Sequence, residues 1–149
     1  MKSFVGRAEA IIQKHQLRLT SPRKMLINFL DKNLEPMTPY EIRDQLKSTG
    51  KKADVVTIYR ILDEFEKLGL VHKVMTLGRY VRCDEAELEA HCEKDHDCHH
   101  YLICENCHKV EEISGENLHD LEKMIETKMK FQVKRHFLEF LGLCSKCKK

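Results

Sequence analysis

The stretch VVTIYRILDEFEKLGLVHKV, residues 55–74, predicts a helix that leads directly into a β-strand. Apolar residues recur at helical spacing in its first part, at Ile58, Ile61, Leu62, Phe65 and Leu68. Gly69 then ends the helix, because glycine readily takes the left-handed conformation found there. Beyond it, LVHKVM and GRYVRC alternate as short strands do, on either side of a turn at Thr76–Gly78. This part of the chain is therefore predicted to be a helix followed by a β-hairpin.

Further helices are predicted upstream of this stretch. Residues 1–16 have the pattern of an amphipathic helix, and residues 20–33 follow as a second one. In residues 37–50, Thr38 and Glu41 have the spacing of a capping box, in which each side chain bonds to the other's backbone. Short helices followed by a hairpin predict a winged helix-turn-helix, an arrangement that places its last helix in the major groove of DNA.

The exposed face of that last helix is predicted to contact DNA through Thr57, Tyr59 and Arg60. Arg60 is expected to contact a guanine edge, and Tyr59 a thymine methyl group or a phosphate. Basic residues expected to neutralise phosphates are Lys14, Arg18, Arg23, Lys51 and Lys52. The alternative is a basic helical bundle that binds no nucleic acid.

The distribution of charge favours DNA binding. The net charge is only +2, but residues 1–82 carry 16 basic and 9 acidic side chains, whereas residues 83–149 carry 10 and 15. A basic half joined to an acidic half rich in cysteine and histidine indicates a polyanion-binding module attached to a metal-binding one.

The cysteines and the hydropathy indicate the compartment. No apolar run reaches the length of a membrane span, and charged residues interrupt any signal-peptide core in residues 1–16. Seven cysteines, an odd number that includes CxxC pairs, favour thiolates in a reducing cytoplasm over disulfides. We therefore expect a cytoplasmic protein with no membrane partner.

The chain is predicted to hold two domains of an α+β fold. Residues 1–83 are the winged helix, residues 84–97 are an acidic linker or hinge, and residues 98–149 are a small α/β domain. In that second domain, HYLIC and KVEEI have the pattern of strands. Residues 117–130 are predicted to be a helix and residues 131–144 a strand.

Two CxxC pairs predict a structural zinc site. Cys104 and Cys107 make one turn that presents two sulfurs, and Cys144 and Cys147 make another. Four thiolates form a tetrahedral set that suits zinc and leaves no open position. The alternative, a redox-active CxxC, lacks a thioredoxin-like context in this chain.

The segments LTSPR, VVTIYRILDEFEKLGLVHKV, HHYLICENCHKVEEI and HFLEFLGLCSKC resemble those of the ferric uptake regulator family of metal-dependent repressors. The resemblance covers nearly the whole chain. It implies a homodimer, held by the C-terminal domain, in which a regulatory metal between the two domains sets their angle. Within the family the chain most resembles the zinc uptake regulator branch.

The resemblance implies regulatory ligands at His72, Cys83, His99 and Glu112, with His96 competing for the place of His99. The iron-sensing branch usually has a carboxylate where Cys83 stands, and its hinge histidine near the second helix is missing here. A thiolate shifts the preference from iron(II) toward zinc. The chain departs from the family pattern at Tyr101, where many members have a second histidine.

A third metal site is also implied by the resemblance. If His99 faces the hinge, strand alternation turns Cys98 and His100 to the opposite face. With His119 and His136, these residues match the third site of some family members. The expected content is thus two or three zinc ions per chain.

The expected function is a dimeric, zinc-responsive repressor of metal-uptake genes that binds a palindromic operator in double-stranded DNA and takes no small-molecule substrate. One alternative is an iron- or peroxide-sensing regulator of the same family. Another is a zinc-storage protein that binds no DNA. A metal-dependent hydrolase is disfavoured because the chain has no HExxH motif, and no enzyme activity is expected.

Overall fold

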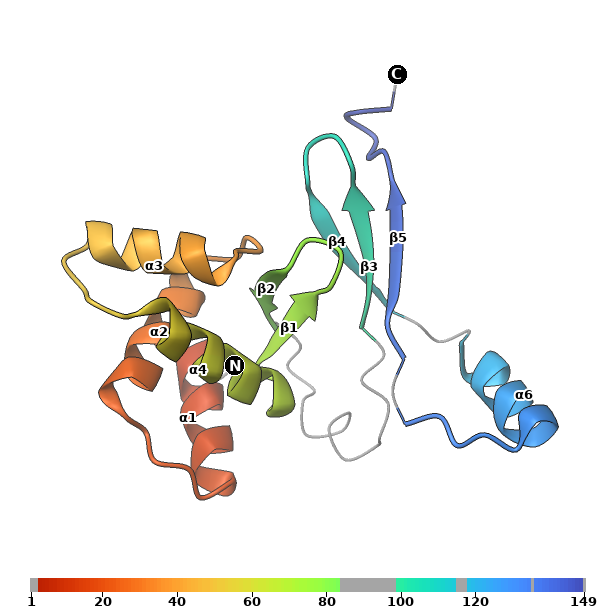
Figure 1. Ribbon diagram of the computed structural model, residues 1–149, viewed down its shortest axis with the longest axis horizontal. Coiled ribbons are helices and arrows are strands. Elements are labelled where there is room, and N and C mark those ends of the chain that lie inside the picture. The colour runs from red at the N-terminus through yellow and green to blue at the C-terminus, as the bar shows by residue number, and fades with distance from the viewer. Residues whose placement is uncertain (1–2, 84–98, 115–117, 135, 149) are drawn as a thin grey trace. The chain divides into compact units, whose positions relative to one another are not determined.

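Helices and a two-stranded hairpin make up the first of the two compact units into which the chain divides, Met1–Ala86 and Glu87–Lys149. The computed structural model describes residues 3–83, 99–114, 118–134 and 136–148. The elements of the first unit (Figure 1) are α1 (Phe4–Lys14), α2 (Ser21–Lys32), α3 (Pro39–Ser48), α4 (Val55–Lys67), β1 (Val71–Val74) and β2 (Arg79–Arg82). The predicted winged-helix order of elements is confirmed.

Side-chain caps mark where α3 and α4 begin. The capping box predicted for α3 is present, since the Thr38 hydroxyl accepts from the Glu41 backbone N–H and the Glu41 carboxylate accepts from the Thr38 N–H at 2.7 Å. Asp54 caps α4 by accepting from the N–H groups of Val56 and Thr57 at 2.9 and 3.1 Å. The Thr57 hydroxyl and these N–H groups hold the pKa of Asp54 below its usual value.

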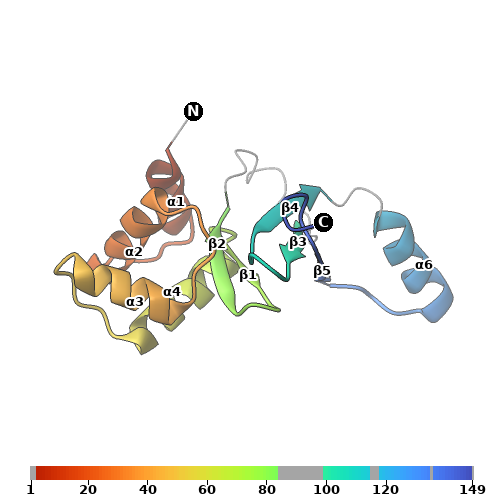
Figure 2. The ribbon, with the colours of Figure 1, turned by 90° about the horizontal axis from the view of Figure 1, so that it is seen from above.

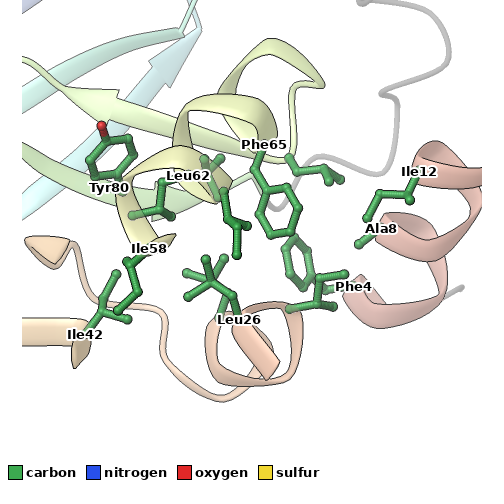
Figure 3. Packing of buried hydrophobic residues seen from close by; sticks show 14 of the residues in the cluster. Phe4, Ala8, Ile12, Leu26, Ile42, Ile58, Leu62, Phe65 and Tyr80 are labelled. Atoms are coloured by element: carbon green, nitrogen blue, oxygen red, sulfur yellow. The ribbon is translucent and has the colours of Figure 1, made fainter. Parts of the chain in front are cut away.

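The core of the first unit lies where α1, α2, α3, α4 and β2 meet (Figure 3). Helix α4 contributes its predicted apolar stripe, and Leu62 and Phe65 are fully buried there. The hairpin is held to this core by Tyr80, whose ring is buried and whose hydroxyl donates to Asp63 at 3.0 Å. Tyr80 also forms a β-bridge with Met37 ahead of α3. The hairpin is thus fixed against α4.

The second unit is a three-stranded sheet with one described helix. Its elements are β3 (His99–Cys104), β4 (Val110–Ser114), α6 (His119–Met129) and β5 (Leu138–Gly142). The strand order is β4-β3-β5, with β3 antiparallel to β4 and parallel to β5. Both ribbon views show α6 beside the sheet instead of over its face (Figures 1 and 2).

The strand predicted for residues 131–144 is shorter than expected. The parallel ladder runs from the pair His100–Leu138 to the pair Cys104–Gly142, so β5 takes only the five residues for which β3 provides partners. The described residues between α6 and β5 have no ladder in the structure. Periodicity alone overestimated the strand, because pairing with a neighbour decides where a strand begins.

The second unit has little apolar core of its own. Its buried apolar residues, within the part of the chain that the structure describes, are Tyr101, Ile103 and Cys104. Large apolar side chains are exposed instead, at Leu102, Leu121, Met124, Met129, Phe131, Phe137, Phe140, Leu141 and Leu143. So small a core is marginal without a metal or a partner.

The predicted linker, residues 84–97, lies outside the described residues, as do His96 and Cys98. No helix among the described residues is long and apolar enough to cross a membrane.

Candidate metal centre and nucleic-acid interface

The two CxxC turns lie at the same end of neighbouring strands. Cys104 is the last residue of β3 and pairs with Gly142, so the chain leaving β5 reaches Cys144 close to Cys104. The Cys144 N–H points at the Cys104 sulfur, at 3.4 Å. Because β3 and β5 are parallel, both turns form at one edge of the sheet.

The four sulfurs of Cys104, Cys107, Cys144 and Cys147 all lie within 4.8 Å of one another. Sulfurs around a tetrahedral zinc, at about 2.3 Å from the ion, are separated by roughly 3.8 Å. The Cys107 and Cys144 sulfurs are 3.7 Å apart. The cluster therefore has the donor type and the dimensions of a closed zinc site.

Backbone hydrogen bonds also favour the thiolate form of Cys104. The Cys144 N–H, and then the Cys107 N–H, lower the pKa of Cys104 to about 6. A thiolate, not a thiol, is the species that binds a metal. The folded turns thus prepare Cys104 as a ligand.

The hairpin places His72 and Cys83 on one face. His72 pairs with Val81 across the ladder, and the Cys83 N–H donates to the Leu70 carbonyl at 3.0 Å, which extends the pairing by one step. Residues 70, 72, 81 and 83 therefore share a face, and His72 and Cys83 are diagonal neighbours. Cys83 is fully buried, and its carbonyl accepts from the Arg7 guanidinium at 3.2 Å.

The other two predicted regulatory ligands lie in the second unit. His99 begins β3 and pairs with Ser114, while Glu112, on β4, pairs with Tyr101 on the next rung of the same face. The register therefore brings positions 99 and 112 close together. The full set of His72, Cys83, His99 and Glu112 joins residues of both units and stays a prediction.

Of the residues predicted for the third site, the structure brings two together, His100 and His136. The His100 and His136 imidazoles lie with their centroids 5.1 Å apart, and His100 is only 2% exposed. His119 is the first residue of α6. The structure adds Glu122, which the sequence analysis missed, at 2.6 Å from His136. The sequence could have pointed to Glu122, because it follows His119 by three residues and such residues lie on the same face of a helix.

The predicted DNA-reading face of α4 is exposed at Tyr59 and Arg60. Thr57 is less available than expected because its hydroxyl donates to the capping carboxylate of Asp54. Tyr40, which the sequence analysis also missed, packs edge-to-face against Tyr59 with ring centroids 6.3 Å apart. Lys51 and Lys52 are exposed just before α4. Lys14 and Arg18 are exposed at and beyond the end of α1.

Arg23, predicted to contact a phosphate, is also part of an ion pair within the first unit. Its guanidinium makes two bonds of 2.7 Å to the Glu64 carboxylate and another to the Arg18 carbonyl. Its side chain is 19% exposed. A fork of this kind is committed to holding α2 against α4.

We expect Arg23→Ala to lower the free energy of unfolding by about 1 kcal/mol, the upper range for a pair exposed to this degree. Urea denaturation of the variant measures the loss. The matched control is Lys24→Ala, at an exposed neighbouring position that should leave stability unchanged. If Arg23→Ala has unchanged stability but binds every DNA sequence more weakly, Arg23 contributes to phosphate binding and not to the stability of the fold.

Comparison with known families gives a match over most of the chain. The model of the "Ferric uptake regulator family" matches residues 14–141. The zinc uptake regulation protein of Escherichia coli (strain K12) is 27% identical over 146 residues, which are 98% of this chain and 82% of that protein. The ferric uptake regulation protein of Bacillus subtilis (strain 168) is 29% identical over 149 residues, covering 99% and 96%.

A solved structure shares the architecture. The structure of a zinc uptake regulator complexed with zinc and DNA superimposes with a TM-score of 0.79 at 27% identity, and the match covers 99% of this chain and 96% of that one. The similarity therefore extends over both units and over the region of the cysteine cluster.

Proposed function

The chain belongs to the ferric uptake regulator family, whose members are metal-responsive transcription regulators and not enzymes, and on that premise we propose that it is a zinc-sensing repressor. It binds palindromic operators of metal-uptake genes as a cytoplasmic homodimer when zinc is plentiful. Two or three zinc ions per chain are proposed.

The observation that carries the choice of zinc is the pair His72 and Cys83 on one face of the hairpin. A thiolate and an imidazole, with His99 and Glu112 as the remaining ligands, make a mixed sulfur, nitrogen and oxygen set. Such a set suits zinc, which has no geometric preference of its own. Iron(II) favours oxygen and nitrogen donors, so this pair disfavours the iron- and peroxide-sensing alternatives.

The exposed apolar side chains of the second unit support the homodimer. Phe137, Phe140 and Leu143 are each about half exposed or more. Large apolar side chains exposed on so small a domain favour a protein interface. A second copy of the chain would bury them and complete the small core of this unit.

DNA binding is proposed for α4 and the basic positions around it. Tyr59 and Arg60 present the base-reading face, and Lys51 and Lys52 stand near it for phosphates. The solved relative that binds DNA shares this fold. A zinc-storage protein would have no use for a basic winged helix.

The proposed switch is a change in the angle between the two winged helices of the dimer. Ligands from both domains, His72 and Cys83 on one side and His99 and Glu112 on the other, favour the closed arrangement when they share an ion. The closed dimer presents both α4 helices at the spacing of two operator half-sites. Zinc thus acts through its greater affinity for the closed state.

A gel shift with and without chelator tests this function. Operator binding that needs added zinc, and is lost on chelation, supports the proposal. Zinc uptake without any binding to DNA would support the storage alternative. Restoration by iron(II) at lower free concentration than by zinc would support the iron-sensing one.

Arg60 and Lys51 are expected to differ in what they contribute. Arg60→Ala should cost about 1–3 kcal/mol of operator binding and relax specificity at one position, because a bidentate contact to guanine is lost. Lys51→Ala should weaken binding to all sequences alike and flatten the salt dependence. Titrations of operator and random DNA at several salt concentrations separate the two. Equal losses on both DNAs in Arg60→Ala would exclude Arg60 as the base reader.

A further inference from the structure

A buried carboxylate lies against one of the histidines of the proposed third site. Glu122, on α6, has a side chain only 9% exposed, and its Oε1 lies 2.6 Å from Nδ1 of His136. Glutamate is rarely buried unless it is paired. A carboxylate oxygen can only accept a hydrogen bond, so Nδ1 is the donor. The distance is at the short end for an N–H to carboxylate bond, as charge-assisted bonds are.

This bond decides which nitrogen of His136 is available to a metal. With the proton on Nδ1, the neutral ring has its lone pair on Nε2. Nε2 is buried, and no described residue forms a hydrogen bond with it. The ring of His100 stands beside that of His136, with centroids 5.1 Å apart and planes tilted by 32°. Two imidazoles side by side, one with a buried lone pair, are donors of a kind that divalent transition metals accept.

We propose that Glu122 is the positioning residue of the third metal site: it holds His136 in the Nδ1–H tautomer so that Nε2 is the ligand atom. The inference rests on the proposed third site, of which the structure describes His100 and His136 side by side. Histidines that bind metals usually donate their second ring nitrogen to a carboxylate or carbonyl, which fixes the tautomer and orients the ring. The ion is a divalent one that accepts imidazole, such as zinc.

The test uses the full-length protein with its structural zinc in place. Nitrogen-15 spectra of the histidine rings give the tautomer of His136 before metal is added, and the His136 signals then report zinc binding at this site as zinc is titrated. In the wild type we expect the Nδ1–H tautomer. Glu122→Ala should lose that preference and weaken zinc binding at His136 about 10–100-fold.

Two further variants make the result specific. Glu122→Gln keeps an oxygen that accepts from Nδ1, so it should retain the tautomer and recover part of the affinity. Glu126→Ala removes an exposed carboxylate one turn further along α6 and should change neither quantity. Structural-zinc content and melting temperature establish that each variant is folded.

Four outcomes would overturn the inference. One is an unchanged His136 tautomer in Glu122→Ala, and another is wild-type zinc affinity at His136 in both Glu122 variants. The third is a wild-type protein whose His136 signals do not respond to zinc. The fourth is a cobalt(II) spectrum that shows a changed coordination in Glu122→Gln, which would make Glu122 a direct ligand. None of these outcomes affects zinc-dependent operator binding, which the gel shift measures separately.

Discussion

Replacing Cys104 or Cys147 by serine will unfold the second unit or dissociate the dimer. The four sulfurs join the ends of β3 and β5, and the unit they join has few buried apolar residues of its own. Metal binding energy at such a site is folding energy, on the order of 10–16 kcal/mol for small zinc domains. This free energy of zinc binding is as large as the total free energy of unfolding of a typical domain, about 5–15 kcal/mol. Zinc analysis, sedimentation and thermal melting of the variants measure the loss.

The matched control is Ser145→Ala, in the same turn as Cys144 and Cys147 and exposed to solvent. It should keep its zinc, its dimer and its melting temperature. A Cys147→Ser protein that stays dimeric with an unchanged melting temperature would show that the cysteine cluster does not stabilise the second unit.

The second large effect is expected at the hinge. Cys83→Ala and His72→Ala should abolish activation of operator binding by zinc while the dimer and the structural zinc stay intact. Loss of a residue that only orients a ligand costs about 10–100-fold in metal affinity, so loss of a ligand itself should cost more than about 100-fold. In the wild type, zinc should activate at far lower free concentration than iron(II) or manganese(II). Gel shifts in metal-buffered solutions measure these differences.

Met75→Ala is the control for the hinge variants, because Met75 lies between β1 and β2 and is 52% exposed. It should respond to zinc as the wild type does. Operator binding by Cys83→Ala at the wild-type zinc concentration would mean that the sensing site lies elsewhere. The residues to examine next would then be Cys98, His100, His119 and His136.

Features that depend on neighbours in the sequence were predictable. The capping box at Thr38 and Glu41, the apolar stripe of α4 and the hairpin after Gly69 each arise from interactions within a few residues, and the structure confirms all three. The CxxC spacings likewise identify sulfur pairs without knowledge of the fold. Short-range periodicity and turn chemistry are properties of the sequence itself.

Features that depend on distant partners needed the tertiary structure. The ion pair of Arg23 with Glu64 arises only because α2 packs against α4, and Glu122 had no evident role until α6 placed it against His136. The extent of β5 was likewise decided by the rungs that β3 offers. The sequence by itself therefore determined the helices, the hairpin, the two CxxC pairs and the excess of positive charge in the first half. Only the tertiary structure decided which charged and polar side chains pair with one another, because burial and pairing arise between segments that the chain brings together from far apart.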